Sequence, residues 1–183
     1  AALASGKCGA VIRADLSAAM LYKQHGLRVV ADEEALPFAD GSLDAIFSAL
    51  SLHHVNDLPG CLIQCRRALK PDGLFLAIVP GPRTLQELRH CLMQEDKISP
   101  RLSPLLEVRD AGALLQRAGF ALPVVDSELL TVTYADPLQL LRELQTMGES
   151  SILRQQHQGL TGKSFWPRVL DRYRQQFSNA DGR

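Results

Sequence analysis

Short apolar runs alternate along the chain with segments of helical spacing. Apolar runs predict strands at residues 10–14, 27–31, 43–50 and 74–79. The runs at 43–50 and 74–79 predict buried strands, and the first of these is expected to be buried on both faces. Apolar residues at every third or fourth position predict helices at residues 17–25, 58–69, 84–96, 111–118, 137–147 and 163–176. Strands that alternate with helices predict an α/β fold with a largely parallel sheet and flanking helices.

Local signals mark the ends of these elements. Ser17 and Asp136-Pro137 are typical of helix starts, and Gly26 and Gly148 of helix ends. Lys70-Pro71-Asp72-Gly73 predicts a turn before the strand at 74–79. Residues 120–134 alternate well enough to predict one or two further strands at the edge of the sheet.

The last predicted helix, residues 163–176, is amphipathic. Its apolar residues recur at helical spacing and are Trp166, Val169, Leu170, Tyr173 and Phe177. Packing of this face on the sheet is the commoner arrangement, and binding to a partner or to a membrane surface is the alternative.

Composition limits the classes of function. With 183 residues, one domain (1–183) is expected, and 20 basic residues balance 20 acidic ones. No overall field therefore recruits nucleic acid, and no apolar run is long enough to predict a transmembrane segment. The four cysteines show no disulfide or CxxC spacing, and Cys61 and Cys65 are expected to be small core residues rather than a metal or redox pair.

Polar residues follow three of the predicted strands directly. Asp15 ends the first, Asp32 and Glu33 end the second, and a segment beginning at Ser51 and containing two histidines ends the third. The carboxyl ends of parallel strands form one rim, where open α/β sheets bind ligands. The pattern therefore predicts a crevice for a small ligand. The alternatives are that Asp15 only caps a helix and that residues 32–34 form a solvated acidic turn.

Three motifs carry a resemblance to a known family. The segments are ADEEALPFADGSLD at 31–44, SALSLHHVNDLP at 48–59 and LKPDGLF at 69–75. They resemble class I S-adenosylmethionine-dependent methyltransferases. The block LSLHHVNDLP, together with MGES at 147–150, more narrowly resembles the methyltransferase-like mitochondrial complex I assembly factor 5 family. That family is a mitochondrial arginine hydroxylase acting on an iron–sulfur subunit of complex I.

The resemblance implies roles for the residues of the rim. It implies S-adenosylmethionine as cofactor, with Asp15 on the ribose hydroxyls, Asp32 on the adenine amino group, and Glu33 and Leu50 beside the ring. Candidates for the substrate pocket are His53, His54, Asn56 and, in a covering loop at 97–109, Arg101. His53 is the weak candidate for a catalytic base. No ligand spacing predicts a metal site, and adjacent histidines are expected to project in different directions.

The chain also departs from the family. No Gly-rich turn after a first strand precedes Asp15, and no final strand follows Phe177. We therefore expect a Rossmann-like class I methyltransferase sheet that lacks its first strand, the Gly-rich loop and its last strand, and a single truncated domain. Such a fragment is expected to leave strand edges unpaired and to be unstable or to aggregate.

Three functions remain open at this point. The first is an S-adenosylmethionine-binding arginine hydroxylase with a protein substrate, on the matrix side of the mitochondrial inner membrane, with which it could associate peripherally. The second is a methyltransferase for a small molecule or an acyl-carrier thioester. The third is a non-catalytic, methyltransferase-like scaffold. Whether the chain is an enzyme, and by which catalytic residue, stays open because methyl transfer needs little beyond positioning.

Overall fold

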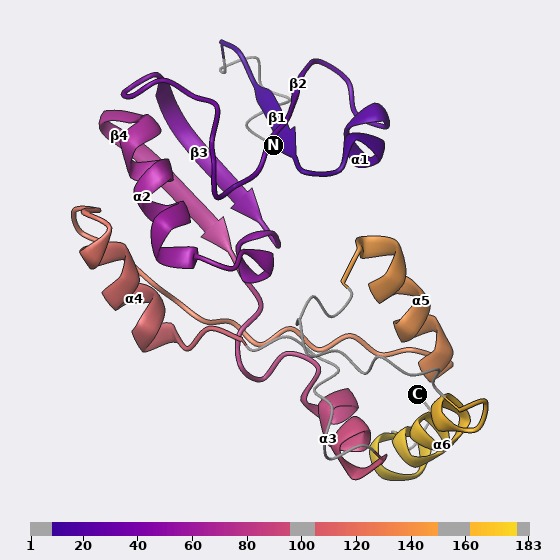
Figure 1. The fold of residues 1–183 in the computed structure, drawn as a ribbon. Coiled ribbons are helices and arrows are strands. Elements are labelled where there is room, and N and C mark those ends of the chain that lie inside the picture. Colours follow the sequence, from indigo (N-terminus) through magenta and orange to yellow (C-terminus); the bar gives the residue numbers. More distant parts are fainter. Residues whose placement is uncertain (1–8, 96–104, 150–161, 179–183) are drawn as a thin grey trace. The chain divides into compact units, whose positions relative to one another are not determined.

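The computed structural model describes residues 9–95, 105–149 and 162–178, with the elements that Figure 1 shows. In chain order they are β1 (Ile12–Asp15), α1 (Ala18–Tyr22), β2 (Leu27–Val30), β3 (Leu43–Ala49), the 3₁₀ turn η2 (Leu52–His54), α2 (Leu58–Ala68), β4 (Leu69–Ile78), α3 (Gln86–Glu95), α4 (Val108–Arg117), α5 (Pro137–Met147) and α6 (Phe165–Phe177). The chain divides into two compact units. Ala1–Val79 with Arg109–Val124 form the first, and Pro80–Val108 with Val125–Arg183 form the second.

The strands of the first unit are parallel, as predicted, and form two separate pairs. β1 pairs with β2 and β3 pairs with β4. The register sets Asp15 opposite Val30 and Ala49 opposite Ile78, so the carboxyl ends of both strands in each pair lie together. Gly26, whose φ is +90°, makes the sharp turn from the end of the α1 segment into β2.

The turn predicted at residues 70–73 is an irregularity inside β4. The register passes from Leu43 opposite Leu69 directly to Ala45 opposite Leu74, so the extra residues bulge out of the ladder. Asp72 has a positive φ of 60° at this point. The proline and the glycine of the turn are therefore accommodated without ending the strand.

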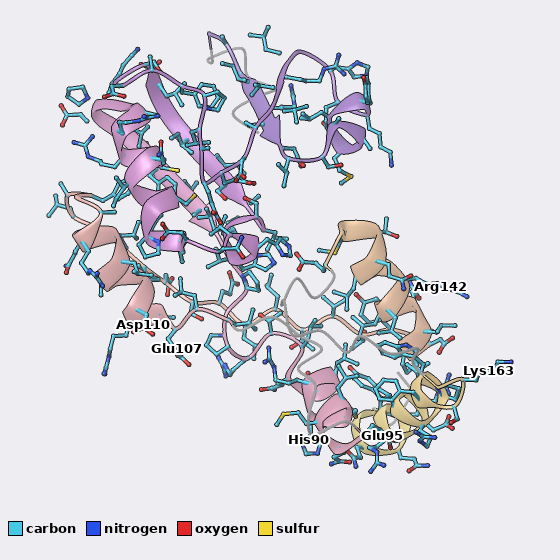
Figure 2. All side chains as sticks on the ribbon, in the orientation of Figure 1. His90, Glu95, Glu107, Asp110, Arg142 and Lys163 are labelled. Atoms are coloured by element: carbon cyan, nitrogen blue, oxygen red, sulfur yellow. The ribbon has the colours of Figure 1, made fainter. Side chains whose placement is uncertain are left out.

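Two helices cover one face of the β3–β4 pair. The buried residues of this core are Leu52, Cys61, Leu62 and Cys65, with partly buried side chains of β3, β4 and α4 around them. The predicted core role of the two cysteines is confirmed, and the hydrogen bond that the Cys61 thiol donates to Cys65, together with burial, raises the pKa of Cys61. α4 begins at Val108, so Asp110 lies in its first turn rather than at its cap (Figure 2).

The opposite face of the β3–β4 pair is exposed. Four large apolar side chains that alternate with the core residues are 53–62% exposed, namely Phe47, Leu74, Leu76 and Ile78. The prediction that the strand at 43–50 is buried on both faces is therefore wrong for the described residues, because α2 and α4 lie on the same face.

In the second unit, three helices pack on one another. α3, α5 and α6 enclose Leu88, Cys91, Leu92, Leu140, Phe165 and Val169. The ends of α5 are as predicted, because Asp136 Oδ1 accepts the amide hydrogen of Leu138 at 3.1 Å and Gly148 ends the helix with a φ of +82°. α6 packs on helices rather than on a sheet, and Trp166 is 38% exposed while its neighbour Phe165 is buried.

Residues 121–134 form no strand, contrary to the prediction. Their backbone is irregular, and several apolar side chains lie in solvent, such as Val124 at 90% and Leu130 at 77% exposure. Alternation shows that a segment could be a strand, but pairing with another strand decides whether it is one. Within the described residues, no helix is long and apolar enough to cross a membrane.

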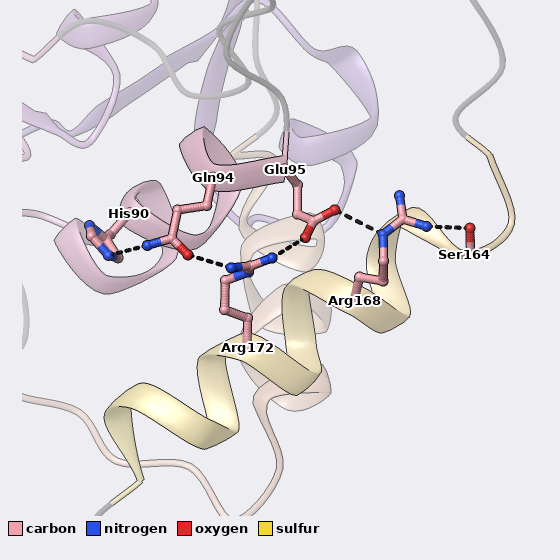
Figure 3. A network of polar contacts seen from close by, with 6 residues as sticks. All are labelled: His90, Gln94, Glu95, Ser164, Arg168 and Arg172. Carbon is pink, nitrogen blue, oxygen red and sulfur yellow. Dashed lines mark hydrogen bonds and ion pairs between the residues drawn. The ribbon is translucent and has the colours of Figure 1, made fainter.

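A polar network fastens α3 to α6 (Figure 3). Glu95, whose side chain is 9% exposed, accepts from Arg168 Nε at 2.8 Å and from Arg172 Nη2 at 2.6 Å. Arg172 also donates to Gln94 Oε1 at 2.7 Å, and Gln94 in turn contacts His90. Hydrogen bonds from Arg168 and Arg172 lower the pKa of the Glu95 carboxyl.

We expect the core face of α2 to dominate the stability of the first unit. Leu62 is 4% exposed, whereas its neighbour Ile63 is 55% exposed. Leu62→Ala should lower the free energy of unfolding by about 2–5 kcal/mol, and Ile63→Ala should change it by less than about 1 kcal/mol. Chemical denaturation followed by circular dichroism measures both. Equal effects of the two substitutions would contradict the packing described.

The α3–α6 contact should weaken in acid. A carboxyl whose pKa is lowered by folding stabilises the fold above its unfolded pKa, and this contribution is lost as the pH falls through the folded pKa. Glu95→Gln should therefore lower the melting temperature at neutral pH and reduce its further fall below about pH 4. Melting curves of the wild type, Glu95→Gln and the exposed-site control Glu128→Gln test this, and parallel pH profiles of the first two would refute it.

Candidate functional site

The candidate site lies at the carboxyl ends of the strands of the first unit. The register sets Asp15 opposite Val30, two residues before Asp32, and the amide of Ala31 donates to the carbonyl oxygen of Asp15 at 3.2 Å. Asp15 and Asp32 therefore follow neighbouring parallel strands, as the sequence predicted. Such ends form the rim at which open α/β sheets bind ligands.

Both carboxylates are oriented by their own backbone. Asp15 Oδ1 accepts the amide hydrogen of Ser17 at 2.7 Å, and Asp32 Oδ1 accepts that of Glu34 at 2.9 Å. Each bond occupies one carboxylate oxygen and fixes the side chain in a turn. A carboxylate has a second oxygen that can accept hydroxyl or amino hydrogens. Closing a turn and binding a ligand are thus compatible roles for these residues.

Leu50 is the first residue after β3. Its amide donates to the carbonyl oxygen of Ile78 at 2.9 Å, and its φ is +53°. A bulky residue in the left-handed region is strained, and such strain is commonest where a chain is held for binding. The turn places Leu50 partly in solvent, at 39% exposure, beside the strand ends.

The loop after β3 carries the next candidates. Leu52 is 5% exposed and anchors η2 in the core, which leaves His53 and His54 half-buried. The two imidazole rings lie together, with centroids 3.9 Å apart and planes tilted by 40°. The expectation that they diverge is wrong: the rings lie close together although successive residues of a 3₁₀ turn start out in different directions. Asn56 is exposed, and Arg101 lies outside the described residues.

Sequence reasoning missed two residues that fasten these loops. Glu34 accepts the amide hydrogens of Asn56 and Asp57, the latter at 3.2 Å. Arg67, in the last turn of α2, donates to the carbonyl oxygens of Leu36 at 3.3 Å and Phe38 at 3.2 Å. Both contacts join positions more than twenty residues apart, so no local pattern points to either.

Two surface hollows are lined by described residues of the second unit and by none of the candidate residues. One of about 500 Å³ is lined by Gln86, Glu87, His90, Gln176 and Phe177. The other, of about 250 Å³, lies over the ion pairs of Glu95. The strand-end geometry, rather than the size of a hollow, therefore defines the candidate site.

Parallel strands that alternate with helices are consistent with part of the Rossmann-like fold of class I methyltransferases. The chain superimposes on a chain of the complex between the Haloferax volcanii Trm112 methyltransferase activator and a candidate methyltransferase. The TM-score is 0.52 at 23% identity, over 64% of this chain and 54% of that one. Residues 1–77 match the methyltransferase domain family.

Curated relatives confirm the resemblance drawn from the motifs. The mitochondrial arginine-hydroxylase NDUFAF5 is 45% identical in Danio rerio, over 67% of this chain and 40% of the relative. The Homo sapiens protein of that name is 41% identical over 84% of this chain and 46% of its own. Malonyl-[acyl-carrier protein] O-methyltransferase of Gallionella capsiferriformans is 42% identical over 80% and 50%. The chain spans about half the length of the curated relatives it matches.

Proposed function

We propose that this chain provides the adenosyl-binding rim of an S-adenosylmethionine-binding protein that acts in the assembly of mitochondrial complex I. The proposed activity is hydroxylation of an arginine in an iron–sulfur subunit. The observation that carries the proposal is the 41–45% identity to relatives named mitochondrial arginine-hydroxylase. The motif LSLHHVNDLP, on which the resemblance to that family rests, forms the loop after β3 and the start of α2.

The residues of the rim fit an adenosyl group. Asp15 and Asp32 present carboxylates on neighbouring strand ends, and a ribose and an adenine offer hydroxyl and amino donors in turn. Asp15 is the proposed ligand of the ribose and Asp32 that of the adenine amino group. Glu33 and Leu50 are proposed to flank the ring, and His53, His54, Asn56 and Arg101 to line the substrate side.

A second function is supported by a separate observation. The relative from Gallionella capsiferriformans, named as an O-methyltransferase for malonyl-[acyl-carrier protein], is 42% identical over 147 residues. In that case S-adenosylmethionine would supply an electrophilic methyl group, and positioning by the rim would suffice. A non-catalytic scaffold is the third alternative, since the fold alone does not fix an activity.

Loss of either carboxylate should weaken cofactor binding. A hydrogen bond to a charged group contributes enough that Asp15→Asn or Asp32→Asn should raise the Kd for S-adenosylmethionine about tenfold or more. Asp44→Asn is the matched control, because Asp44 lies near the amino end of β3, where Asp44 Oδ1 contacts Lys70 at 2.7 Å. Isothermal titration calorimetry measures all four proteins. Unchanged affinity in both rim variants would rule out the assigned carboxylate roles, and no binding by the wild type would argue for the scaffold.

The reaction should be recognised by its product mass. Hydroxylation inserts one oxygen atom into a C–H bond, so it consumes dioxygen and two electrons from a reductant and also forms water. The protein is incubated with an iron–sulfur subunit substrate, S-adenosylmethionine, dioxygen and a reductant. The masses of the peptides of that subunit are then measured by mass spectrometry. We expect the gain of one oxygen on an arginine. The gain of one methylene, there or on a malonyl carrier offered in parallel, would favour the methyltransferase instead.

A further inference from the structure

The carboxylate of Glu34 joins two loops that lie far apart in the sequence. Glu34 follows β2 by four residues, and its Oε1 accepts the amide hydrogens of Asn56 and Asp57. The bond from the Asp57 amide is 3.2 Å long and joins residues 23 positions apart. One side chain therefore connects the strand end that carries Asp32 with the loop that begins at His53.

The start of α2 explains why an outside carboxylate is used. Asp57 caps the helix, and its Oδ1 accepts the amide hydrogen of Gly60 at 3.0 Å. In a capping box the residue at this third helical position returns a carboxylate to the amide of the cap. Here that position is glycine, and a Cβ on it would lie 2.3 Å from Asp57 Oδ2.

Glu34 therefore takes the place of the missing capping-box residue. A carboxylate at the amino end of a helix is also favoured by the helix dipole. The helix thus receives from the β2 loop what its own sequence cannot provide. Because the contact is made across two loops, it also sets their separation, which a local capping box would not do.

The same loop is fastened again at the other end of α2. Arg67 Nη2 donates to the carbonyl oxygens of Leu36 and Phe38, and Arg67 Nε lies 3.2 Å from Asp40 Oδ1. Residues 34–40 are therefore tied to both ends of α2. In the described part of the chain β1–β2 and β3–β4 form separate sheets, and the contacts of Glu34 and Arg67 link the loop after β2 to α2, which follows β3.

We propose that Glu34 is a positioning residue of the adenosyl rim, which holds the loop at His53–Asn56 in register with Asp32. The inference rests on the function proposed above and adds to it a residue that orients both sides of the site without touching the cofactor. The competing explanation is that Glu34 only stabilises α2. The two explanations make different predictions for loss of the contact. If Glu34 is a positioning residue, the structure around Asp32 changes; if it only stabilises α2, that region stays as it is.

Three substitutions separate geometry from charge. Glu34→Gln keeps an oxygen acceptor, Glu34→Asp is one methylene too short, and Glu34→Ala removes the acceptor. We expect Glu34→Ala and Glu34→Asp to raise the Kd for S-adenosylmethionine about tenfold, and Glu34→Gln to stay within about twofold of the wild type. Asp57→Ala is the control, because it removes the cap of the same helix while leaving the amide that Glu34 binds.

NMR of the backbone amides of the full chain, without ligand, detects the contact of Glu34 with Asn56 and Asp57. In Glu34→Ala, hydrogen exchange at Asn56 and Asp57 should accelerate, and amide shifts should change both at 32–34 and at 53–57. Asp57→Ala should affect only the start of α2. Shift changes confined to Asn56 and Asp57, or an equal loss of affinity in Asp57→Ala at equal melting temperature, would overturn the positioning role.

The NMR result also separates this inference from the proposed function. If the wild type does not bind S-adenosylmethionine but both loops respond to Glu34→Ala, the cofactor proposal fails and the positioning of the loops stands. If the wild type binds the cofactor and Glu34→Ala binds it equally well, the cofactor proposal stands and the positioning role is overturned.

Discussion

Backbone pairing within each strand pair, and side-chain contacts between the pairs, are the constraint on which the candidate site depends. Hydrogen bonds between parallel strands fix Asp15 opposite Val30 and Ala49 opposite Ile78. No shared ladder joins the two pairs in the described residues, so the strand ends are aligned through loops. Glu34 and Arg67 make this alignment by side chain to backbone contacts. Backbone bonds from Gly41 and Ser42 to the carbonyl oxygens of Arg67 and Ala68, each 2.9 Å long, hold the same loop against the end of α2.

The periodicity of the sequence predicted the positions of helices and strands better than it predicted which elements they pair with or pack against. β2 begins at Leu27 and α5 lies between Asp136 and Gly148 as expected, because local signals determine where each begins or ends. Residues 121–134 alternate like a strand but pair with nothing in the described chain. The amphipathic spacing of α6 showed which face is covered but not by what, and the face meets helices rather than a sheet. Pairing and packing are set by distant residues that a local pattern does not contain.

In the candidate site, too, local patterns predicted some residues, whereas contacts between distant residues could not be predicted. Parallel strands end at one rim, so the proximity of Asp15 and Asp32 could be predicted from the sequence alone. Glu34 could not be found in this way, because its partners lie 22 and 23 residues further along the chain. The one hint in the sequence is a missing residue, the glutamate of a capping box at the start of α2. Gly60 stands where a helix capped by Asp57 would otherwise carry a glutamate, so the carboxylate had to come from elsewhere.

Two kinds of curated relatives are similar to this chain. Proteins named as arginine hydroxylases and as O-methyltransferases are similar to this chain at comparable identity, 41–45% and 42%. A feature that serves both must concern what a common fold binds, which is the role proposed for the strand ends at Asp15 and Asp32. We propose that the loop after β3, where the rings of His53 and His54 lie 3.9 Å apart, faces the substrate in either reaction. Glu34 contacts that loop two residues beyond His54, so under this proposal one side chain positions both the adenosyl side and the substrate side of the rim.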